Sequence, residues 1–143
     1  PAATAQPEGT NTPPVTNRLG TLTIRGQDIS IANNVDEATL DKSPGWMPDS
    51  ALPGESGMCV ILGHRNRKHL RPLEKMKQGG IISFAYPDGR TATYTVTVTI
   101  IYENTADWRL PAAEGDTLVL VTCWPFRYSG NAPGKYQIIC IKN

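Results

Sequence analysis

A chain of 143 residues is the size of one domain and is long enough to bury an ordinary hydrophobic core. Its formal net charge is +1 and its charged residues, 19% of the total, are interspersed, which argues against a nucleic-acid partner or a polybasic membrane surface. No apolar run approaches the roughly 20 residues that a membrane-spanning helix needs. The three cysteines are too few and too scattered for a disulfide framework or a zinc site.

The first 17 residues differ in composition from the rest of the chain. Residues 1–17 are rich in Pro, Thr, Ala and Asn and have no hydrophobic periodicity, which predicts an extended tether that forms no core. Because the chain begins with Pro1, we expect it to be processed or cut from a longer protein. The folded domain is then expected over residues 18–143.

Short strands begin directly after the tether. Residues 20–24 alternate between apolar and polar, and residues 29–31 resume the pattern after a turn, which predicts a hairpin. Residues 35–40 are predicted to form one or two helical turns. Residues 43–48 are expected to be irregular, because their prolines and glycine disfavour regular ladders. Trp46, within this segment, either packs the loop down, which we favour, or lines a substrate path.

A second apolar strand leads to a histidine. The strand is predicted over Met58–Leu62, and His64 follows it. Alone, a histidine after a glycine is more often a surface or hydrogen-bonded core residue than a catalyst. Beyond it, apolar residues at helical spacing predict a short helix over 70–77, which Gly79–Gly80 ends.

The clearest strand of the chain lies in its second half. Residues 81–86 and 91–100 are predicted to form a hairpin around a turn at 87–90. In the second strand every even position is apolar and every odd one is Thr, a strict period of two. Ile100–Ile101 breaks this pattern and predicts a bulge or bend. Residues 104–114 carry no strand pattern and are expected to form a loop.

A thiol occurs at the end of the next strand. Residues 117–122 are β-branched and aliphatic, and Pro125 ends the strand, so Cys123 is predicted on its last rung, where it meets solvent. A buried, structural role for Cys123 is the alternative. Cys59 and Cys140 lie inside apolar strand sequence and are expected to be packed and unreactive. Whether these two form a disulfide is left open by the sequence.

A closing strand over residues 136–141 completes the pattern. Many short strands with one or two short helices predict a mostly-β fold, a closed barrel of about eight strands. A cysteine must be a thiolate to attack a carbonyl, and an imidazole can hold its proton and later return it to a leaving amine. Cys123 and His64, each at the end of a strand, are therefore the candidate reactive pair.

Three motifs occur in a fixed order, Leu52–Gly57, then Gly63–Arg65, then Thr117–Cys123. Together they resemble the markers of the sortase family, the cysteine transpeptidases of Gram-positive cell surfaces, and they have that family's spacing. The resemblance extends from about Leu19 to the C-terminus. Residues 123–133 are most similar to class D members.

One position departs from the family pattern. Sortases carry an arginine shortly after the cysteine, usually before an aromatic residue on the last strand. Here that position is Lys135, followed by Tyr136. The resemblance implies that this cation steadies the substrate backbone and the oxyanion, although lysine lacks the planar fork of donors that arginine offers. Arg127, four residues after Cys123, is the alternative.

The resemblance also implies an activity. A sortase cleaves a C-terminal sorting signal of the Leu-Pro-x-Thr-Gly or Leu-Pro-x-Thr-Ala type after its threonine and passes the acyl group to an amine. Cys123 would be the nucleophile, His64 would protonate the departing amine, and Lys135 would complete the catalytic set. The substrate-binding residues expected by the same resemblance are Thr122, Trp124, Arg127 and Leu110.

The expected partners follow from the same resemblance. They are surface proteins that bear a sorting signal, and an amine of a peptidoglycan precursor or a pilin. The protein is expected on the extracellular face of the cell membrane, held by an N-terminal anchor that precedes this chain. The chemistry needs no cofactor or metal, and the carboxylates are not clustered as a calcium site would require.

Two other classes of function remain open from the sequence. A hydrolytic cysteine peptidase would use the same Cys–His pair and give the free acid, whether or not an amine is present. A non-catalytic surface adhesion or scaffold barrel would form no acyl-enzyme at all.

Overall fold

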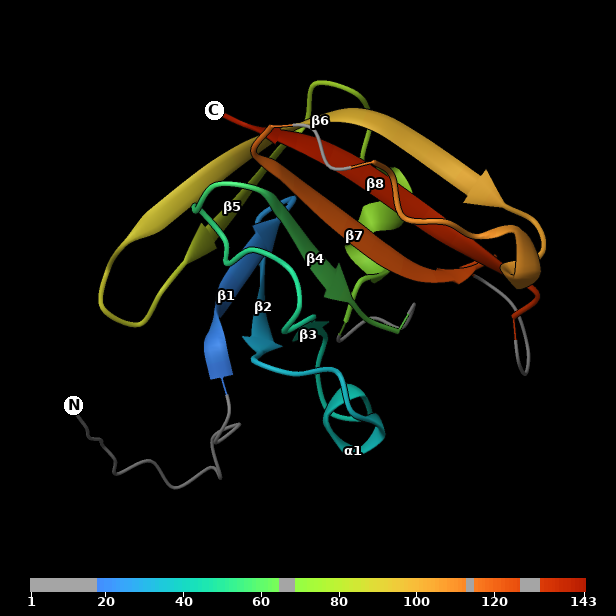
Figure 1. Cartoon of the computed structure of the whole chain (residues 1–143), viewed down its shortest axis with the longest axis horizontal. Helices are drawn as coiled ribbons and strands as arrows, with labels where there is room; N and C mark the ends of the chain where they lie inside the picture. Colours follow the sequence, from blue (N-terminus) through green and yellow to red (C-terminus); the bar gives the residue numbers. More distant parts are fainter. Residues whose placement is uncertain (1–17, 65–68, 113–114, 127–131) are drawn as a thin grey trace.

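The computed structural model describes residues 18–64, 69–112, 115–126 and 132–143. The predicted tether and Arg127 lie outside these residues. Within the described part of the chain, eight strands form a closed barrel in the order β1-β2-β3-β4-β7-β8-β6-β5 (Figure 1). The strands are β1 (Arg18–Ile24), β2 (Gln27–Ala32), β3 (Gly45–Trp46), β4 (Met58–Leu62), β5 (Ile81–Ala85), β6 (Thr91–Tyr102), β7 (Thr117–Trp124) and β8 (Gly134–Lys142). The predicted mostly-β closed barrel is confirmed.

Helices are few and short in the described residues. The segment predicted as one or two turns is a single turn, α1 (Glu37–Leu40), whose N-cap Asp36 accepts a hydrogen bond from the backbone of Thr39. The helix expected over 70–77 is a shorter 3₁₀ helix, η2 (Arg71–Lys75), because Met76 already has an extended backbone. A further 3₁₀ turn, η3 (Thr105–Asp107), lies in the β6–β7 link.

None of these helices has the length and apolar character needed to cross a membrane, among the residues that the structure describes.

The irregular segment expected over 43–48 contains a strand, so that prediction is wrong at two residues. Gly45 pairs with Ala32 on β2 and with β4 on its other side. Pro44 does not interrupt the ladder, because it lies just outside the strand and its carbonyl accepts from the Ala32 amide at 2.9 Å. A Cβ on Gly45 would lie 2.0 Å from the Asn34 carbonyl oxygen, so only glycine fits.

The bulge in β6 lies earlier than the sequence indicates. The register with β8 shifts between Val96 and Val98, whereas Ile100–Ile101 pairs regularly with Gln137 and Tyr136. The extra residue reverses which side of the strand faces the core, since Val96 is buried and Val98 is 43% exposed. The sequence alternation continues through the bulge without a break, which is why the pattern placed the irregularity too late.

Two apolar clusters flank the central strands β4, β7 and β8. The barrel interior holds the larger one, to which β7 contributes Leu118 and Leu120. The alternate residues Val119 and Val121 belong to a second cluster, on the outer face of the barrel, where the β6–β7 link covers them. β7 is therefore buried on both faces, as its continuous apolar sequence predicted.

The Leu52–Gly57 motif is fixed at the end of the barrel where β4 and β7 begin. The Gly54 amide donates to the Tyr94 hydroxyl at 2.7 Å, and the Gly54 carbonyl accepts from Lys142 Nζ at 3.0 Å. The Tyr86 hydroxyl donates to the carbonyl of the motif's proline. Tyr94 on β6, Lys142 on β8 and Tyr86, which follows β5, thus hold this loop at the end of the barrel opposite to Cys123.

Candidate active site

The parallel pairing of β4 and β7 brings His64 and Cys123 to the same level. Leu62 on β4 pairs with Val121 on β7, and the amide of the next residue, Gly63, donates to the Val121 carbonyl at 3.0 Å. Two residues beyond each member of that pair lie His64 and Cys123. Cys123 lies within β7 and therefore shares the outer face of Val121. His64 lies two residues beyond the end of β4, and both residues line the same pocket.

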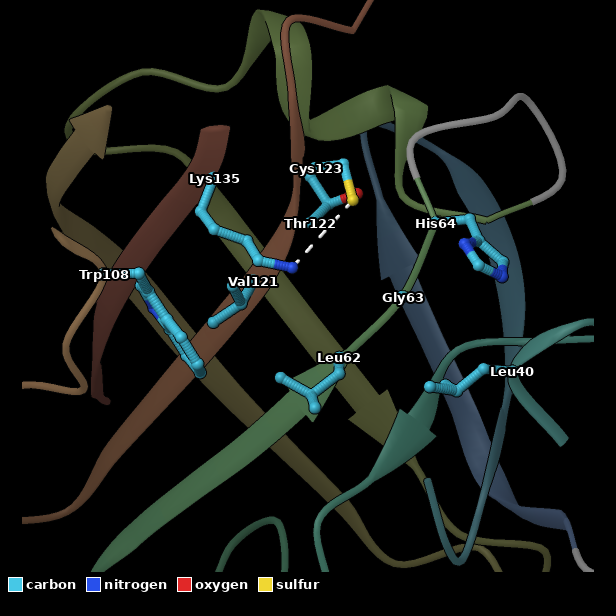
Figure 2. Close-up of a pocket in the computed structure, with 9 residues that line it drawn as sticks. All are labelled: Leu40, Leu62, Gly63, His64, Trp108, Val121, Thr122, Cys123 and Lys135. Carbon is cyan, nitrogen blue, oxygen red and sulfur yellow. Dashed lines mark hydrogen bonds between the residues drawn. The ribbon is translucent and has the colours of Figure 1, made fainter. Parts of the chain in front are cut away.

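The antiparallel pairing of β7 and β8 adds a cation on the other side of the thiol. Cys123 pairs directly with Lys135, and Lys135 Nζ lies 4.0 Å from Cys123 Sγ (Figure 2). Directly opposed residues of an antiparallel pair project from the same face. The cysteine and the lysine therefore lie at one level of two adjacent strands, and His64 follows the end of β4, which pairs with β7 on its other side.

These three residues line a single pocket of about 170 Å³. The rest of its wall is largely apolar, with side chains contributed by Leu40, Leu62, Trp108 and Val121. A wall of this kind favours apolar groups of a ligand and limits the water around the thiol. Cys123 itself is half-buried, so a ligand in the pocket can reach its sulfur.

The two basic side chains adopt different orientations. In Figure 2 the Lys135 ammonium points toward the cysteine sulfur, whereas the His64 imidazole points away from it. The His64 ring instead lies against His69, with 5.3 Å between ring centroids and 37° between the planes. A rotation of the His64 side chain is needed before it can exchange a proton at the thiol.

His69 is a buried partner that the sequence reasoning did not identify as part of the site. It is 3% exposed, and its Nδ1 has no hydrogen-bond partner among the described residues. Burial lowers the pKa of His69, the nearby His64 lowers it further, and a hydrogen bond to the Lys42 backbone opposes both effects. His69 is thus favoured in its neutral form beside His64.

Lys135 is also flanked by an aromatic ring. Its Nζ lies 5.9 Å from the centroid of the Trp108 ring, and the Trp108 Nε1 donates to Gln137 Oε1 at 2.9 Å. The sequence placed Trp108 in the loop expected over residues 104–114 but gave it no individual role. Gln137 was missed, although a lone amide in the apolar run of residues 136–141 was a usable indication.

The predicted substrate-binding residues are not all in this pocket. Thr122 lines it, and its buried Oγ1 has no partner among the described residues. Trp124 packs against the interior cluster and Leu110 against the outer one, and neither lines this pocket. Trp46 also packs on the interior cluster, and its Nε1 donates to the Ala51 carbonyl at 2.9 Å, in agreement with the packing role that we favoured.

The other two cysteines are buried and free. Burial raises the pKa of Cys59 and of Cys140 to about 12, so neither is a ready nucleophile at neutral pH. Leu118 on β7 pairs with both of them, so they lie two strand spacings apart, about 10 Å. A disulfide needs its Cα atoms within roughly 7 Å, so the register excludes a bridge between them.

In the described ranges, no three His, Cys, Asp or Glu side chains are grouped as a metal site would need.

Comparison with known proteins identifies the family. The sortase domain model matches residues 22–141. Sortase D of Bacillus subtilis (strain 168) is 31% identical over 111 residues, which are 78% of this chain and 56% of that protein. The chain therefore spans little more than half the length of this relative.

Solved structures share the fold. Sortase C of Streptococcus pneumoniae aligns with a TM-score of 0.76 at 24% identity, covering 90% of this chain and 70% of the other. Sortase A from Corynebacterium diphtheriae aligns with a TM-score of 0.74 at 25% identity, covering 88% of this chain and 60% of the other. A Clostridium perfringens sortase D5 transpeptidase gives a TM-score of 0.72 at 20% identity, covering 88% and 79%. The chain belongs to the sortase family.

Proposed function

We propose that this protein is a cysteine transpeptidase that cleaves a C-terminal sorting signal and joins the new carboxyl end to an amine. The observation that carries the proposal is that Cys123 pairs directly with Lys135 and shares one pocket with His64, which follows the end of the neighbouring strand β4. A nucleophile, a proton carrier and a cation are the groups that acyl transfer through a thioester requires.

The first half of the reaction forms an acyl-enzyme. The Cys123 thiolate adds to the carbonyl carbon of the signal's threonine, and the carbonyl electrons move to its oxygen. The Lys135 ammonium, already next to the sulfur, donates to that oxyanion. When the intermediate collapses, the C–N bond breaks and His64 gives a proton to the departing amine, which leaves a thioester on Cys123.

The second half transfers the acyl group. An incoming amine adds to the thioester, His64 takes a proton from its nitrogen, and the C–S bond breaks to return the Cys123 thiolate. A new amide forms, and no net proton is gained or lost over the cycle. The apolar pocket wall supports transfer rather than hydrolysis, because it limits the water that competes with the amine.

The substrate and location are proposed from family membership. The signal is of the Leu-Pro-x-Thr-Gly or Leu-Pro-x-Thr-Ala type, and the apolar wall around Leu40 and Leu62 suits its leucine and proline. The acceptor is an amine of a peptidoglycan precursor or a pilin. The domain acts on the extracellular face of a Gram-positive membrane, anchored through a segment that precedes residue 1.

Mass spectrometry of the intact protein tests this function. The 143-residue chain is incubated with peptides of both signal types, and a mass increase equal to the acyl fragment is expected at Cys123. Cys123→Ala should abolish this adduct, and His64→Ala should nearly abolish it. Turnover by Cys123→Ala would refute the nucleophile assignment.

Added amine separates the classes of function. With di- or triglycine present, a transpeptidase releases the peptide joined to the amine, whereas a peptidase releases the same free acid as before. A scaffold barrel forms neither product nor adduct. Product that does not change on adding amine would therefore support the hydrolytic alternative.

A further inference from the structure

Lys135 needs support if it is to act on Cys123. A lysine ammonium is a point charge on a flexible four-carbon stem, and its donors rotate freely. The pairing of Lys135 with Cys123 fixes the backbone of Lys135, but it does not fix the position of the ammonium at the end of its side chain. The 4.0 Å approach of Nζ to the cysteine sulfur therefore requires groups that restrict the stem.

The Trp108 indole is one such group. Trp108 follows η3 in the β6–β7 link, lines the pocket, and presents its ring 5.9 Å from Lys135 Nζ. Figure 2 shows the indole and the lysine side chain on the same side of the cysteine. The negative face of an indole attracts a cation, so the ring restricts the ammonium to the space between the indole and the cysteine sulfur.

Gln137 in turn fixes the indole. The Gln137 side chain is fully buried, two residues after Lys135 on β8 and opposite Val121 of β7, so it shares their outer face. Its Oε1 accepts the Trp108 Nε1 proton at 2.9 Å. Because the indole nitrogen only donates, this bond also settles which end of the amide faces it.

Packing alone does not account for Gln137. Its neighbours in the outer cluster include Val119, Val121 and Ile139, and its Nε2 has no partner in the part of the chain that the structure describes. A buried amide with an unused donor is unfavourable compared with a leucine or methionine of similar size. The hydrogen bond to Trp108 gives a reason for a glutamine at this buried position.

We propose that Gln137 and Trp108 are positioning residues for Lys135. The buried amide holds the indole, and the indole face holds the ammonium beside the Cys123 sulfur. Neither residue touches the reacting atoms, and both act through the lysine. The role of this positioning in catalysis rests on the proposed function. Its effect on the reactivity of the Cys123 thiol does not, and can be measured without a substrate.

The test is therefore made on the thiol rather than on a peptide. The rate of alkylation of Cys123 by iodoacetamide at pH 7 is measured by mass spectrometry, with buried Cys59 and Cys140 as unreactive internal standards. Gln137→Met removes the acceptor at similar volume, and Trp108→Phe keeps a ring but removes the donor. Each variant is expected to lower the rate about three- to tenfold, the size of a weakened cation–ring contact.

Double variants distinguish positioning from general loosening of the loop. In a Lys135→Ala background, Gln137→Met and Trp108→Phe should change the rate by less than about twofold, because no ammonium remains to be positioned. Gln137→Met should likewise add nothing to Trp108→Phe. An equal loss with and without Lys135 would overturn the proposal, as would an unchanged rate in both single variants.

A matched control lies in the same link. Asn104 caps η3 by accepting from the Ala106 amide at 2.9 Å, and among the described residues its side chain makes no hydrogen bond to Trp108 or Gln137. Asn104→Ala should leave the alkylation rate within about twofold of the parent. A loss as large as that of Gln137→Met would overturn the proposal in favour of simple link anchoring.

Thermal unfolding of each variant confirms that the barrel is intact before rates are compared. The alkylation rates of the single and double variants, compared as a double-mutant cycle, also separate this inference from the proposed function. If the parent protein forms no acyl-enzyme with either peptide while the cycle behaves as expected, the proposed function fails and the positioning role stands. If the acyl-enzyme forms but the cycle shows no dependence on Lys135, the positioning role fails alone.

Discussion

Cys123 and Lys135 are directly paired residues of two antiparallel strands, and Lys135 Nζ lies 4.0 Å from Cys123 Sγ. The cation is therefore supplied by the sheet itself rather than by a loop. A shift of one residue in the β7–β8 register would turn the lysine to the opposite face of the sheet. The β7–β8 hydrogen bonds that help to close the barrel thus also place the charge beside the thiol.

The Lys135 series tests which cation serves the oxyanion. We expect Lys135→Ala to lower kcat/KM by about 10²–10³, the usual effect of removing one oxyanion donor. Lys135→Arg should preserve or raise kcat/KM, because a guanidinium keeps the charge and adds a fork of donors. Arg127→Ala is the matched comparison on the same peptide. A near-normal Lys135→Ala beside an inactive Arg127→Ala would move the role to Arg127.

The buried cysteines should matter for stability only. Cys59→Ala and Cys140→Ala each remove a sulfur atom from a packed site, and we expect each to lower the free energy of unfolding by roughly 1–2 kcal/mol. Urea unfolding measures this loss, and alkylation of Cys123 should be unchanged. Cys123→Ala, at a half-buried position, is the control and should change the free energy of unfolding less. A folded Cys59 or Cys140 variant in which Cys123 is no longer alkylated would contradict the prediction that these two cysteines affect stability only.

His69 should make the fold sensitive to mild acid. Its folded-state pKa is lowered from 6.5, by burial first and then by His64. Below about pH 6.5 the unfolded chain binds a proton that folded His69 resists, so the free energy of unfolding falls as the pH drops and rises with pH. Urea midpoints at pH 5 and pH 7 should differ less in His69→Gln than in the parent. Equal pH dependence in both proteins would show that other groups are responsible, and His64→Ala tests the contribution of the neighbouring ring.

Tyr94 should stabilise the far end of the barrel. Tyr94→Phe leaves the buried ring in place but removes the acceptor of the Gly54 amide, and we expect a loss of about 1–2 kcal/mol in the free energy of unfolding. Tyr102→Phe is a matched control, because its hydroxyl makes an exposed and longer bond to the Arg109 carbonyl. Chemical unfolding of both variants provides the comparison. Equal losses would mean that the Gly54 contact contributes nothing specific.

Local pattern alone determined much of this protein. The period of two in residues 91–100 and the apolar run of residues 117–122 predicted strands, Pro125 predicted where the second of them ends, and the fold class followed from the number of such strands. Predicted strand ends identified His64 and Cys123 as candidates, because a residue near a strand end is both held and exposed. The prediction that Cys123 is the last residue of its strand was wrong, since β7 continues one residue past it to Trp124, and His64 lies two residues past the end of β4. These properties depend on neighbours in the sequence, so a sequence pattern records them.

Tertiary structure decided what depends on register. The two-residue strand at Gly45 exists only because β2 and β4 lie on either side of it, and the bulge between Val96 and Val98 appears only in the pairing with β8. The pocket shared by His64, Cys123 and Lys135 likewise follows from how three distant segments align. Hydrogen bonds between strands set that alignment, and they join residues far apart in the chain, which no local pattern records.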